Sequence, residues 1–337
     1  MIPCGLYCVA SSHDFLGLVA LLNSLRLTGN DAPLFVGDCG LTTAQRERLA
    51  PHVILADVDV TGSPHLAKSA VPLAFPAEVT VLLDIDIIVT GSLDALVAAS
   101  RQRPVVFADP LWHRFDENWG RLLGLRSLRR GPYFNAGVIG LPACRAPEIL
   151  ALVGKAQTRV DTEATWIGEG TSGNPFSFGD QDVWNAVFAA QLEPNELLVL
   201  EQRLAAHPPF PWLRVVDERS LDCRYPDGTA PIVLHHVGEK PWLAQTRPNI
   251  YSRMITRLLL EDDLTLPLDR KEVPRRLREH ATGDAARFYA ASAASFRTIR
   301  GSIGIRSRSR RRSPQPDNAK KPPRGMLPEP DTIVREA

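Results

Sequence analysis

The sequence lacks any apolar run of about 18 residues, the length that a membrane-spanning helix requires. Its first residues, Met1 to Gly5, contain no basic stretch followed by an apolar one, so we expect no secretory signal peptide. Cysteine is scarce, with five among 337 residues, and no two of them form the Cys-x-x-Cys pair found in many zinc and redox sites. Reduced thiols and a cytoplasmic location are therefore expected.

The body of the chain also lacks an excess of positive charge. The net charge is +1, but residues 297–324 contain ten Lys and Arg against one acid, Asp317, so the rest of the chain carries −8. Nucleic-acid-binding domains usually present a basic surface. We therefore do not expect nucleic acid as a partner of the body.

The basic residues belong to a polar, Pro-rich segment that predicts a disordered tail over 298–337. Such a tail is a candidate for peripheral contact with an anionic membrane surface on the cytoplasmic side, at about 1 kcal/mol per nearby basic residue. A solvated tail without a partner is the alternative. Residues 261–297 are expected to form a helical extension.

The first 260 residues alternate short apolar runs with amphipathic stretches, the pattern of strands joined by crossover helices. This predicts an α/β fold with a mainly parallel central sheet flanked by helices. Strands are expected at Leu6–Ala10, Leu34–Val36, Val53–Leu55, Val79–Leu83, Pro104–Ala108, Val138–Leu141 and Pro231–Leu234. Helices are expected at Phe15–Leu27, Thr42–Ala50, Ser63–Lys68, Pro147–Gln157 and Gln181–Gln191, with a loop over Gly168–Gly179.

Two acids interrupt the most apolar of these strands, in the run Leu83-Asp84-Ile85-Asp86-Ile87. Residues two apart on an extended chain point to the same side, so Asp84 and Asp86 can face one ligand. Two like charges beside a core are unfavourable unless a cation neutralises them. Mg²⁺ or Mn²⁺ accepts carboxylate oxygens and can bridge to a diphosphate, which makes the pair a candidate metal site. The alternative is a strand end at which both acids meet solvent.

Three later segments place polar side chains beside expected strands or helix ends: Pro132–Leu141, Gly179–Asn185 and Leu234–Trp242. In the first, Asn135 can bond sugar hydroxyls, although a tight turn is the alternative. In the second, Asp180 suits a helix N-cap and Gln181 projects from the first turn. In the third, His235 can complete a metal set with two acids, and Lys240 can stabilise phosphate charge.

Taken in this order, the four segments resemble glycosyltransferase family 8, the retaining enzymes that include glycogenin and the bacterial lipooligosaccharide galactosyltransferases. The resemblance covers about Leu6 to Trp242. It implies a GT-A fold with a Rossmann-like nucleotide-sugar-binding domain, here over residues 1–260, together with a UDP-sugar donor and Mn²⁺ or Mg²⁺. It also implies retaining transfer of a hexose, with glucose and galactose as first candidates, to a glycan, a glycolipid or another acceptor.

The resemblance implies roles for individual residues as well. By that likeness, Asp84, Asp86 and His235 hold the metal. The catalytic positions are Gln181, on the reacting face of the sugar, Asp180, a donor-sugar contact, and Lys240, a phosphate contact. The remaining donor-binding positions are Ala10, Ser12, Phe15, Lys68, Ile85, Asn135, Ala136 and Gly238.

The sequence departs from the family pattern in two places. Only one residue separates the Gly of the last segment from Lys240, where the family usually has two, and this leaves His236 as a rival metal ligand. Ser12 occupies the position of an acid that commonly contacts uracil. Phe15 can still stack on the base, and Asp14 is a substitute for the missing acid.

Two further hypotheses concern the reaction and the acceptor. No paired nucleophilic carboxylate is obvious beside Gln181, which favours addition of the acceptor on the face that the leaving group vacates, with a phosphate oxygen as base. Asp180 and Asp182 stay as candidates for a covalent route. The stretch Asp109–Arg130, rich in aromatics and Arg, is long for a simple connection. It suits either a sugar acceptor or a helical cover that packs its aromatics on the core.

Two other functions compete with this interpretation. A nucleotidyltransferase needs a Gly-rich, basic phosphate loop after the first strand, and Ala10–Asp14 has none. A catalytically impaired scaffold could use its basic tail to bind an anionic membrane or nucleic acid. That second alternative is disfavoured by the joint presence of five residues of the pattern: Asp84, Asp86, His235, Asn135 and Gln181.

Overall fold

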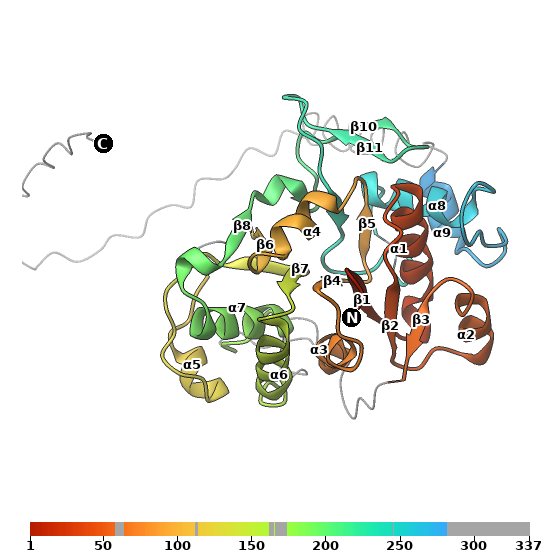
Figure 1. The fold of residues 1–337 in the computed structure, drawn as a ribbon. Coiled ribbons are helices and arrows are strands. Elements are labelled where there is room, and N and C mark those ends of the chain that lie inside the picture. Colours follow the sequence, from red (N-terminus) through yellow and green to blue (C-terminus); the bar gives the residue numbers. More distant parts are fainter. Residues whose placement is uncertain (58–63, 112–113, 162–164, 166–173, 245, 282–337) are drawn as a thin grey trace, which may run out of the picture. The chain divides into compact units, whose positions relative to one another are not determined.

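The computed structural model describes residues 1–57, 64–111, 114–161, 165, 174–244 and 246–281, all within one compact unit, Met1–Tyr289 (Figure 1). The expected tail over 298–337 lies outside the described residues. The largest sheet has seven strands in the order β3-β2-β1-β4-β7-β6-β8. Their bounds are β1 Gly5–Ala10, β2 Leu34–Asp38, β3 Ile54–Ala56, β4 Val79–Leu83, β6 Val105–Ala108, β7 Phe134–Pro142 and β8 Leu198–Leu200.

This sheet is mostly parallel, as the sequence predicts. Strands β3, β2, β1 and β4 run parallel to one another, and so do β6 and β8. Only β7 runs antiparallel to both of its neighbours, β4 and β6. The α/β class and the mainly parallel sheet are therefore confirmed, with β7 as the exception in the middle.

A smaller three-stranded sheet joins two distant parts of the sequence. It consists of β5 (Ile87–Val89), β12 (Val233–His235) and β9 (Ala205–Ala206). Strands β5 and β12 are antiparallel, and Ile87 of β5 lies opposite His235 of β12. The strand that follows Asp86 is thus paired with the strand that ends at His235, which brings the predicted metal ligands together. A separate hairpin consists of β10 (Arg214–Asp217) and β11 (Asp222–Arg224).

Helices cover both faces of the large sheet (Figure 1). Their bounds are α1 Phe15–Leu27, α2 Thr43–Leu49, α3 Pro64–Ala74, α4 Asp94–Ser100, α5 Asn118–Leu123, α6 Ala146–Gln157, α7 Asp180–Gln191, α8 Ile250–Leu260 and α9 Arg275–Ala281. Among the described residues, none of the helices is long and apolar enough to span a bilayer.

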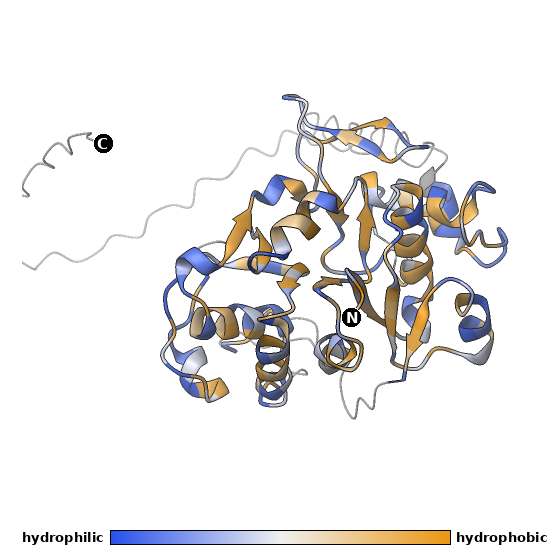
Figure 2. Ribbon diagram, viewed as in Figure 1, coloured by the Kyte–Doolittle hydropathy of each residue, from blue (hydrophilic) through white to orange (hydrophobic). Residues whose placement is uncertain are grey.

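Two hydrophobic cores lie on the two faces of the sheet, whose strands are apolar in Figure 2. Along β1, Leu6 and Cys8 belong to the first core and Tyr7 to the second, because successive side chains of a strand point to opposite faces. The first core takes in α1 and α8, and the second takes in α5, α6 and α7. Between α8 and α9 the chain is irregular and adds Leu266 and Leu268 to the first core.

Some strands differ from the bounds expected from the sequence. Strand β3 starts one residue later than predicted, and β12 starts at Val233 and ends at His235. The largest correction is β7, which begins at Phe134 and not at Val138. Its first residues pair with β6, with Phe134 opposite Ala108, and Phe134 and Ala136 are buried in the second core. Burial and pairing outweigh the turn preference of the Asn and Gly in this segment.

Candidate active site

The chain bends at Asp84 and Asp86. Strand β4 ends at Leu83 and β5 begins at Ile87, so the two acids lie in a turn and not on one extended strand as predicted. The backbone N–H of Asp84 donates to the carbonyl of Gly137 (2.8 Å), and the carbonyl of Asp86 accepts from the N–H of His236 (3.0 Å). The turn is therefore fixed at one end by β7 and at the other by His236, the residue directly after β12.

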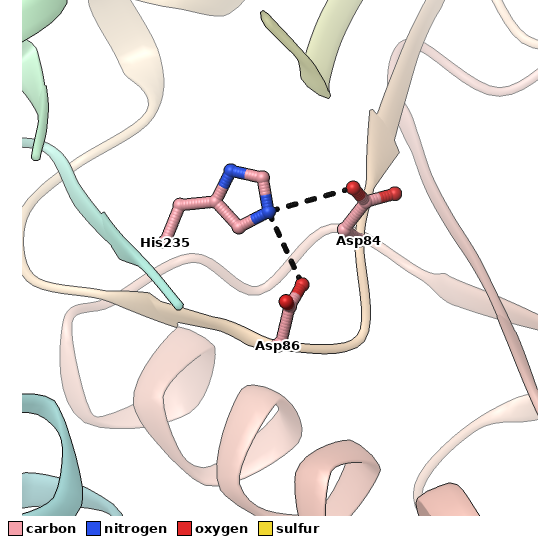
Figure 3. A group of neighbouring side chains, drawn as sticks. All are labelled: Asp84, Asp86 and His235. Carbon is pink, nitrogen blue, oxygen red and sulfur yellow. Dashed lines mark ion pairs between the residues drawn. The ribbon is translucent and has the colours of Figure 1, made fainter. Parts of the chain in front are cut away.

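This turn directs both carboxylates at one imidazole nitrogen. Nε2 of His235 lies 3.5 Å from Asp84 Oδ2 and 3.2 Å from Asp86 Oδ1 (Figure 3). The three ligand atoms all lie within 4.8 Å of one another. Asp86 and His235 are buried, and Asp84 is about one-third exposed at 32%. The cluster is thus closed on the protein side and open on the side of Asp84.

The donor set fits a hard divalent cation. Two oxygen or nitrogen ligands on adjacent corners of an octahedral ion lie about 3 Å apart, because the bonds of Mg²⁺ are about 2.1 Å long. The two separations measured from His235 Nε2 are close to that value. Two carboxylates and an imidazole suit Mg²⁺, Mn²⁺ and related ions, and three protein ligands leave positions for a substrate.

Lysine side chains compensate the charge of both acids. Lys240 forms a short ion pair with Asp86 Oδ2. Burial by itself raises the pKa of Asp86, but His235 and Lys240 outweigh it and hold that pKa well below its usual range. Asp84 Oδ1 accepts a hydrogen bond of 2.6 Å from the ammonium of Lys68. Neutralisation explains how two carboxylates can share the edge of a core.

Lys68 also joins the acids to the rest of the site. Its buried ammonium donates to the carbonyl of Ala136 (2.7 Å) and lies 3.6 Å from Asp180 Oδ2. Lys68, Asp84, Ala136 and Asp180 come from α3, the turn after β4, β7 and α7. One cation therefore fastens four separate segments at the point where the resemblance places the donor.

Strand β7 has an irregularity beside the acids. Val106 of β6 lies opposite Ile139, but the next residue, Phe107, lies opposite Asn135, so Ala136 to Val138 have no partners on β6. Bulges of this kind re-aim side chains and are common next to active sites. A Cβ on Gly137 would lie 2.3 Å from Cε1 of His235, so only glycine leaves room for the imidazole.

The carboxamide of Gln181 lies next to this bulge. Its Oε1 accepts from Asn135 Nδ2 (3.0 Å) and from the N–H of Ala136 (3.3 Å). Its Nε2 donates to the hydroxyl of Tyr133 (3.0 Å) and to Asp109 Oδ2 (3.3 Å). The structure therefore brings Gln181 together with Asn135 and Ala136, two of the residues that the resemblance assigns to the donor sugar.

The acids on either side of Gln181 have different surroundings. Asp180 is the first residue of α7, whose N-cap is Gly179, so the predicted N-cap role of Asp180 is wrong by one position. Asp182 is completely buried and accepts two hydrogen bonds from Arg114, Nε at 2.8 Å and Nη2 at 2.7 Å. A carboxylate engaged in this way is not free to attack a sugar.

The two adjacent histidines point to different neighbours. His235 faces the acids, whereas the ring of His236 packs on Tyr251 (4.9 Å between centroids) and its Nε2 lies 3.4 Å from Asn249 Nδ2. In this geometry His235, and not His236, completes the three-residue cluster. The ring of His207 packs edge-on against His235 at 5.2 Å, and nothing in the sequence around His207 indicates this position.

The residues expected near the nucleobase make contacts within the protein: Phe15 in the first core, and Asp14 with Ser11. Phe15 is buried in the first core with the guanidinium of Arg48 5.8 Å from its ring centroid, so the predicted stacking on a base stays a prediction. Asp14 accepts hydrogen bonds from the N–H (3.1 Å) and the hydroxyl (2.7 Å) of Ser11. Ser12 begins the short 3₁₀ helix η1 (Ser12–Asp14).

Of the other predicted donor positions, one ends a strand and two lie in loops. Ala10 is the last residue of β1, and Ile85 stands between the two acids. Gly238 has a left-handed φ of 94°, which favours glycine, in the loop that carries Lys240 back to Asp86.

The stretch Asp109–Arg130 serves largely as the predicted cover. Trp119, on α5, is fully buried and stacks on Phe176, with ring centroids 6.4 Å apart. Trp112 and His113 lie outside the described residues. Sequence reasoning missed Tyr133, Asp109 and Arg114, although a buried tyrosine two positions before Asn135 needs a hydroxyl partner and so points to a polar neighbour.

Comparison with solved structures places this geometry in a known architecture. The galactosyltransferase LgtC in complex with donor and acceptor sugar analogues is 19% identical, with a TM-score of 0.50 over 82% of this chain and 99% of that one. An active-site mutant of LgtC gives 17% identity and a TM-score of 0.51 over the same shares. The chain has the GT-A fold. The fold expected from the resemblance to family 8 is therefore confirmed.

Another glycosyltransferase shares this architecture. The bifunctional glycosyltransferase WbbM is 16% identical, with a TM-score of 0.53 over 78% of this chain and 50% of that one. No protein-family model matches the sequence. No curated protein matches it either. At such low identity the likeness concerns the fold, and the chemistry has to be argued from the residues of the site.

Proposed function

We propose that the protein is a metal-dependent, retaining glycosyltransferase that moves a hexose from a UDP-sugar to a glycan, glycolipid or other acceptor. One observation carries the proposal. In a GT-A fold, the two acids that follow β4, Asp84 and Asp86, meet His235 at the end of β12. Asp84, Asp86 and His235 would hold Mn²⁺ or Mg²⁺. The ion would supply charge stabilisation for the departing diphosphate.

The lysines of the site support this assignment. Lys240 is 27% exposed and extends from a loop to Asp86, so its ammonium can also meet a phosphate bound at the same place. Lys68 is buried and held by three groups, which suits a fixed positive charge more than a mobile one. Positive groups placed in advance stabilise a leaving group without reorganisation during the reaction.

The surroundings of Gln181 favour addition of the acceptor on the same face as the leaving group. Asp182 is neutralised by Arg114 and completely buried, which removes one of the two candidate nucleophiles. Asp180 lies against Lys68 and is 14% exposed. A phosphate oxygen of the leaving diphosphate would then take the proton of the acceptor hydroxyl.

The proposal is tested by donor hydrolysis and transfer with purified protein. A panel of UDP- and GDP-sugars is incubated with Mn²⁺ or with EDTA, and released nucleotide is quantified. We expect one donor to be turned over with Mn²⁺ only, and Asp86→Ala to abolish turnover. The matched control is Asp262→Ala, which removes an exposed acid from the loop after α8.

Each outcome decides between named alternatives. Metal-dependent release of UDP that survives in Asp262→Ala and disappears in Asp86→Ala supports the proposal and identifies the donor. Release of pyrophosphate from a nucleoside triphosphate would favour a nucleotidyltransferase. No binding or turnover of any nucleotide-sugar under any divalent metal would overturn the proposal in favour of a scaffold.

A further inference from the structure

The carboxamide of Gln181 can lie in only one of its two orientations. A backbone N–H only donates, so the group 3.3 Å from the N–H of Ala136 must be the carboxamide oxygen. An ionised carboxylate only accepts, so the group 3.3 Å from Asp109 Oδ2 must be the carboxamide nitrogen. A flip of the amide would therefore break two hydrogen bonds and oppose like groups in both.

The hydroxyl of Tyr133 completes this arrangement. It donates to Asp182 Oδ1 at 2.7 Å, and this donation commits its hydrogen. Only its oxygen lone pairs then remain for Gln181, whose Nε2 donates to that oxygen at 3.0 Å. Tyr133 is 1% exposed, so water cannot replace it as an acceptor without entering the second core.

The anchor behind Tyr133 is charged and rigid. Asp182 accepts from Arg114 through two parallel hydrogen bonds and from the N–H of Phe178 at 3.0 Å. Bidentate pairs of this kind fix geometry as well as charge. The guanidinium of Arg114 is itself held over the Phe178 ring, 4.9 Å from its centroid. Arg114 and Tyr133 both donate to Asp182, and Tyr133 therefore accepts from Gln181. The direction of each hydrogen bond thus follows from the one before it.

We propose that Tyr133 is a positioning residue that holds the Gln181 carboxamide in this one orientation during sugar transfer. The proposal rests on the glycosyltransferase function proposed above. With Tyr133 in place, Oε1 of Gln181 is turned toward Asn135 and Ala136, the side assigned to the donor sugar. A carbonyl oxygen on that side favours the positive charge that develops at the anomeric carbon, whereas an amide nitrogen would oppose it.

The first test is a double-mutant cycle in donor hydrolysis with Mn²⁺, using Tyr133→Phe, Gln181→Ala and the double variant. Tyr133→Phe is expected to lower kcat about tenfold and to leave the donor KM within about twofold, because orientation and not binding is lost. In the Gln181→Ala background the same substitution is expected to have no further effect on kcat. Multiplication of the two effects would overturn the proposal, because Tyr133 would then act independently of Gln181.

Tyr7→Phe is the matched control. Tyr7 is also 1% exposed, and its hydroxyl donates to the carbonyl of Phe75 at 2.6 Å. Both substitutions therefore remove one buried hydroxyl and the hydrogen bond that it donates, and both are expected to lower the melting temperature. An equal loss of kcat in Tyr7→Phe would show that the effect of Tyr133→Phe is general destabilisation.

A second test needs no activity. The chain has eight glutamines, few enough for their side-chain amides to be resolved by NMR after selective ¹⁵N labelling of glutamine. The Gln181 pair, assigned by its absence in Gln181→Ala, is expected to exchange slowly with D₂O in the wild type and about tenfold faster in Tyr133→Phe. The other glutamine pairs should be unchanged.

The two tests separate this inference from the proposed function. An altered Gln181 amide without turnover of any donor would retain the positioning contact and reject the glycosyltransferase. Normal turnover with an unchanged Gln181 amide in Tyr133→Phe would retain the enzyme and reject the positioning role. Tyr133→Phe that slows turnover, loosens the Gln181 amide and has no effect without Gln181 is the result we expect.

Discussion

The ammonium of Lys68 lies 2.6 Å from Asp84 Oδ1, and the Lys68 side chain is only 3% exposed. Burial by itself lowers the pKa of this lysine, but the carboxylates of Asp84 and Asp180 outweigh it and raise the pKa above its ordinary value. A pKa above the ordinary lysine value keeps the Lys68 ammonium protonated at neutral pH. This ammonium acts as the internal counter-ion of a site that has two acids after β4 and a third at the start of α7.

Replacement of Lys68 by an apolar residue should destabilise the fold. Lys68→Met keeps most of the side-chain volume but leaves Asp84 and Asp180 without their cation, and the unfolding free energy should fall by about 3 kcal/mol. Urea denaturation of the metal-free protein measures this loss. Lys155→Met, an exposed substitution on α6, is the control and should change stability by less than about 0.5 kcal/mol. Equal stability of both variants would contradict the counter-ion role.

The two adjacent histidines should differ in metal binding. His235→Ala removes a ligand atom from the cluster and should weaken Mn²⁺ binding more than about tenfold, since even the loss of an outer partner of a ligand costs that much. His236→Ala removes a ring that packs on Tyr251, and it should lower stability with Mn²⁺ affinity unchanged within about twofold. Calorimetric titration with Mn²⁺ distinguishes them, and the reverse order of affinities would make His236 the ligand.

A methyl group on β7 should disturb the same imidazole. Gly137→Ala would place its Cβ 2.6 Å from Nδ1 of His235 and 2.9 Å from Oδ1 of Asn135, distances at which one neighbour must move. We expect Mn²⁺ affinity to fall about tenfold while circular dichroism shows a retained fold. Gly131→Ala is the matched control, because a Cβ there meets no heavy atom within 4 Å. Unchanged affinity in Gly137→Ala would mean that His235 does not bind the ion.

Stability should decrease on mild acidification. Burial first, and the neighbouring His235 second, lower the pKa of His207 from 6.5 to about 3. Below pH 6.5 the unfolded chain therefore binds a proton that the folded protein does not, and stability is lost as the pH falls from about 6.5 toward 3. From pH 7 to pH 5 in EDTA, unfolding by urea should show a loss of about 2 kcal/mol that is absent in His207→Phe. The same loss in both proteins would assign it to other groups.

The sheet could be predicted well because its signal is local. Val79–Leu83 is a continuous apolar run, and the structure gives β4 the same bounds. Short strands such as β9, of two residues, and β5, directly after the acids, have no pattern of their own and form by pairing with β12. Pairing between distant segments is a property of the folded chain, and the sequence shows no local sign of it.

The predicted metal ligands could be found from the sequence, but the residues that hydrogen-bond to Gln181 could not. Asp84 and Asp86 stand out because acids are rare in apolar runs, and the likeness to family 8 adds His235. The hydrogen-bond partners of Gln181 do not stand out in the sequence. Tyr133 looks like an ordinary core aromatic residue, and Asp109 looks like an ordinary acid after a strand. Their importance follows from the direction of their hydrogen bonds, which is a property of the folded chain.

The bulge in β7 limits how this site can change in length. Phe134 and Ala136 face the second core at even positions, whereas Ile139 and Leu141 face it at odd ones, so the alternation reverses across the bulge. Deletion of one residue between Ala136 and Ile139 would turn either the Asn135 end of the strand or its Ile139 end to the opposite face. Insertions and deletions within β7 would therefore disturb both the site and the second core, and we expect variation in length to occur in the loops.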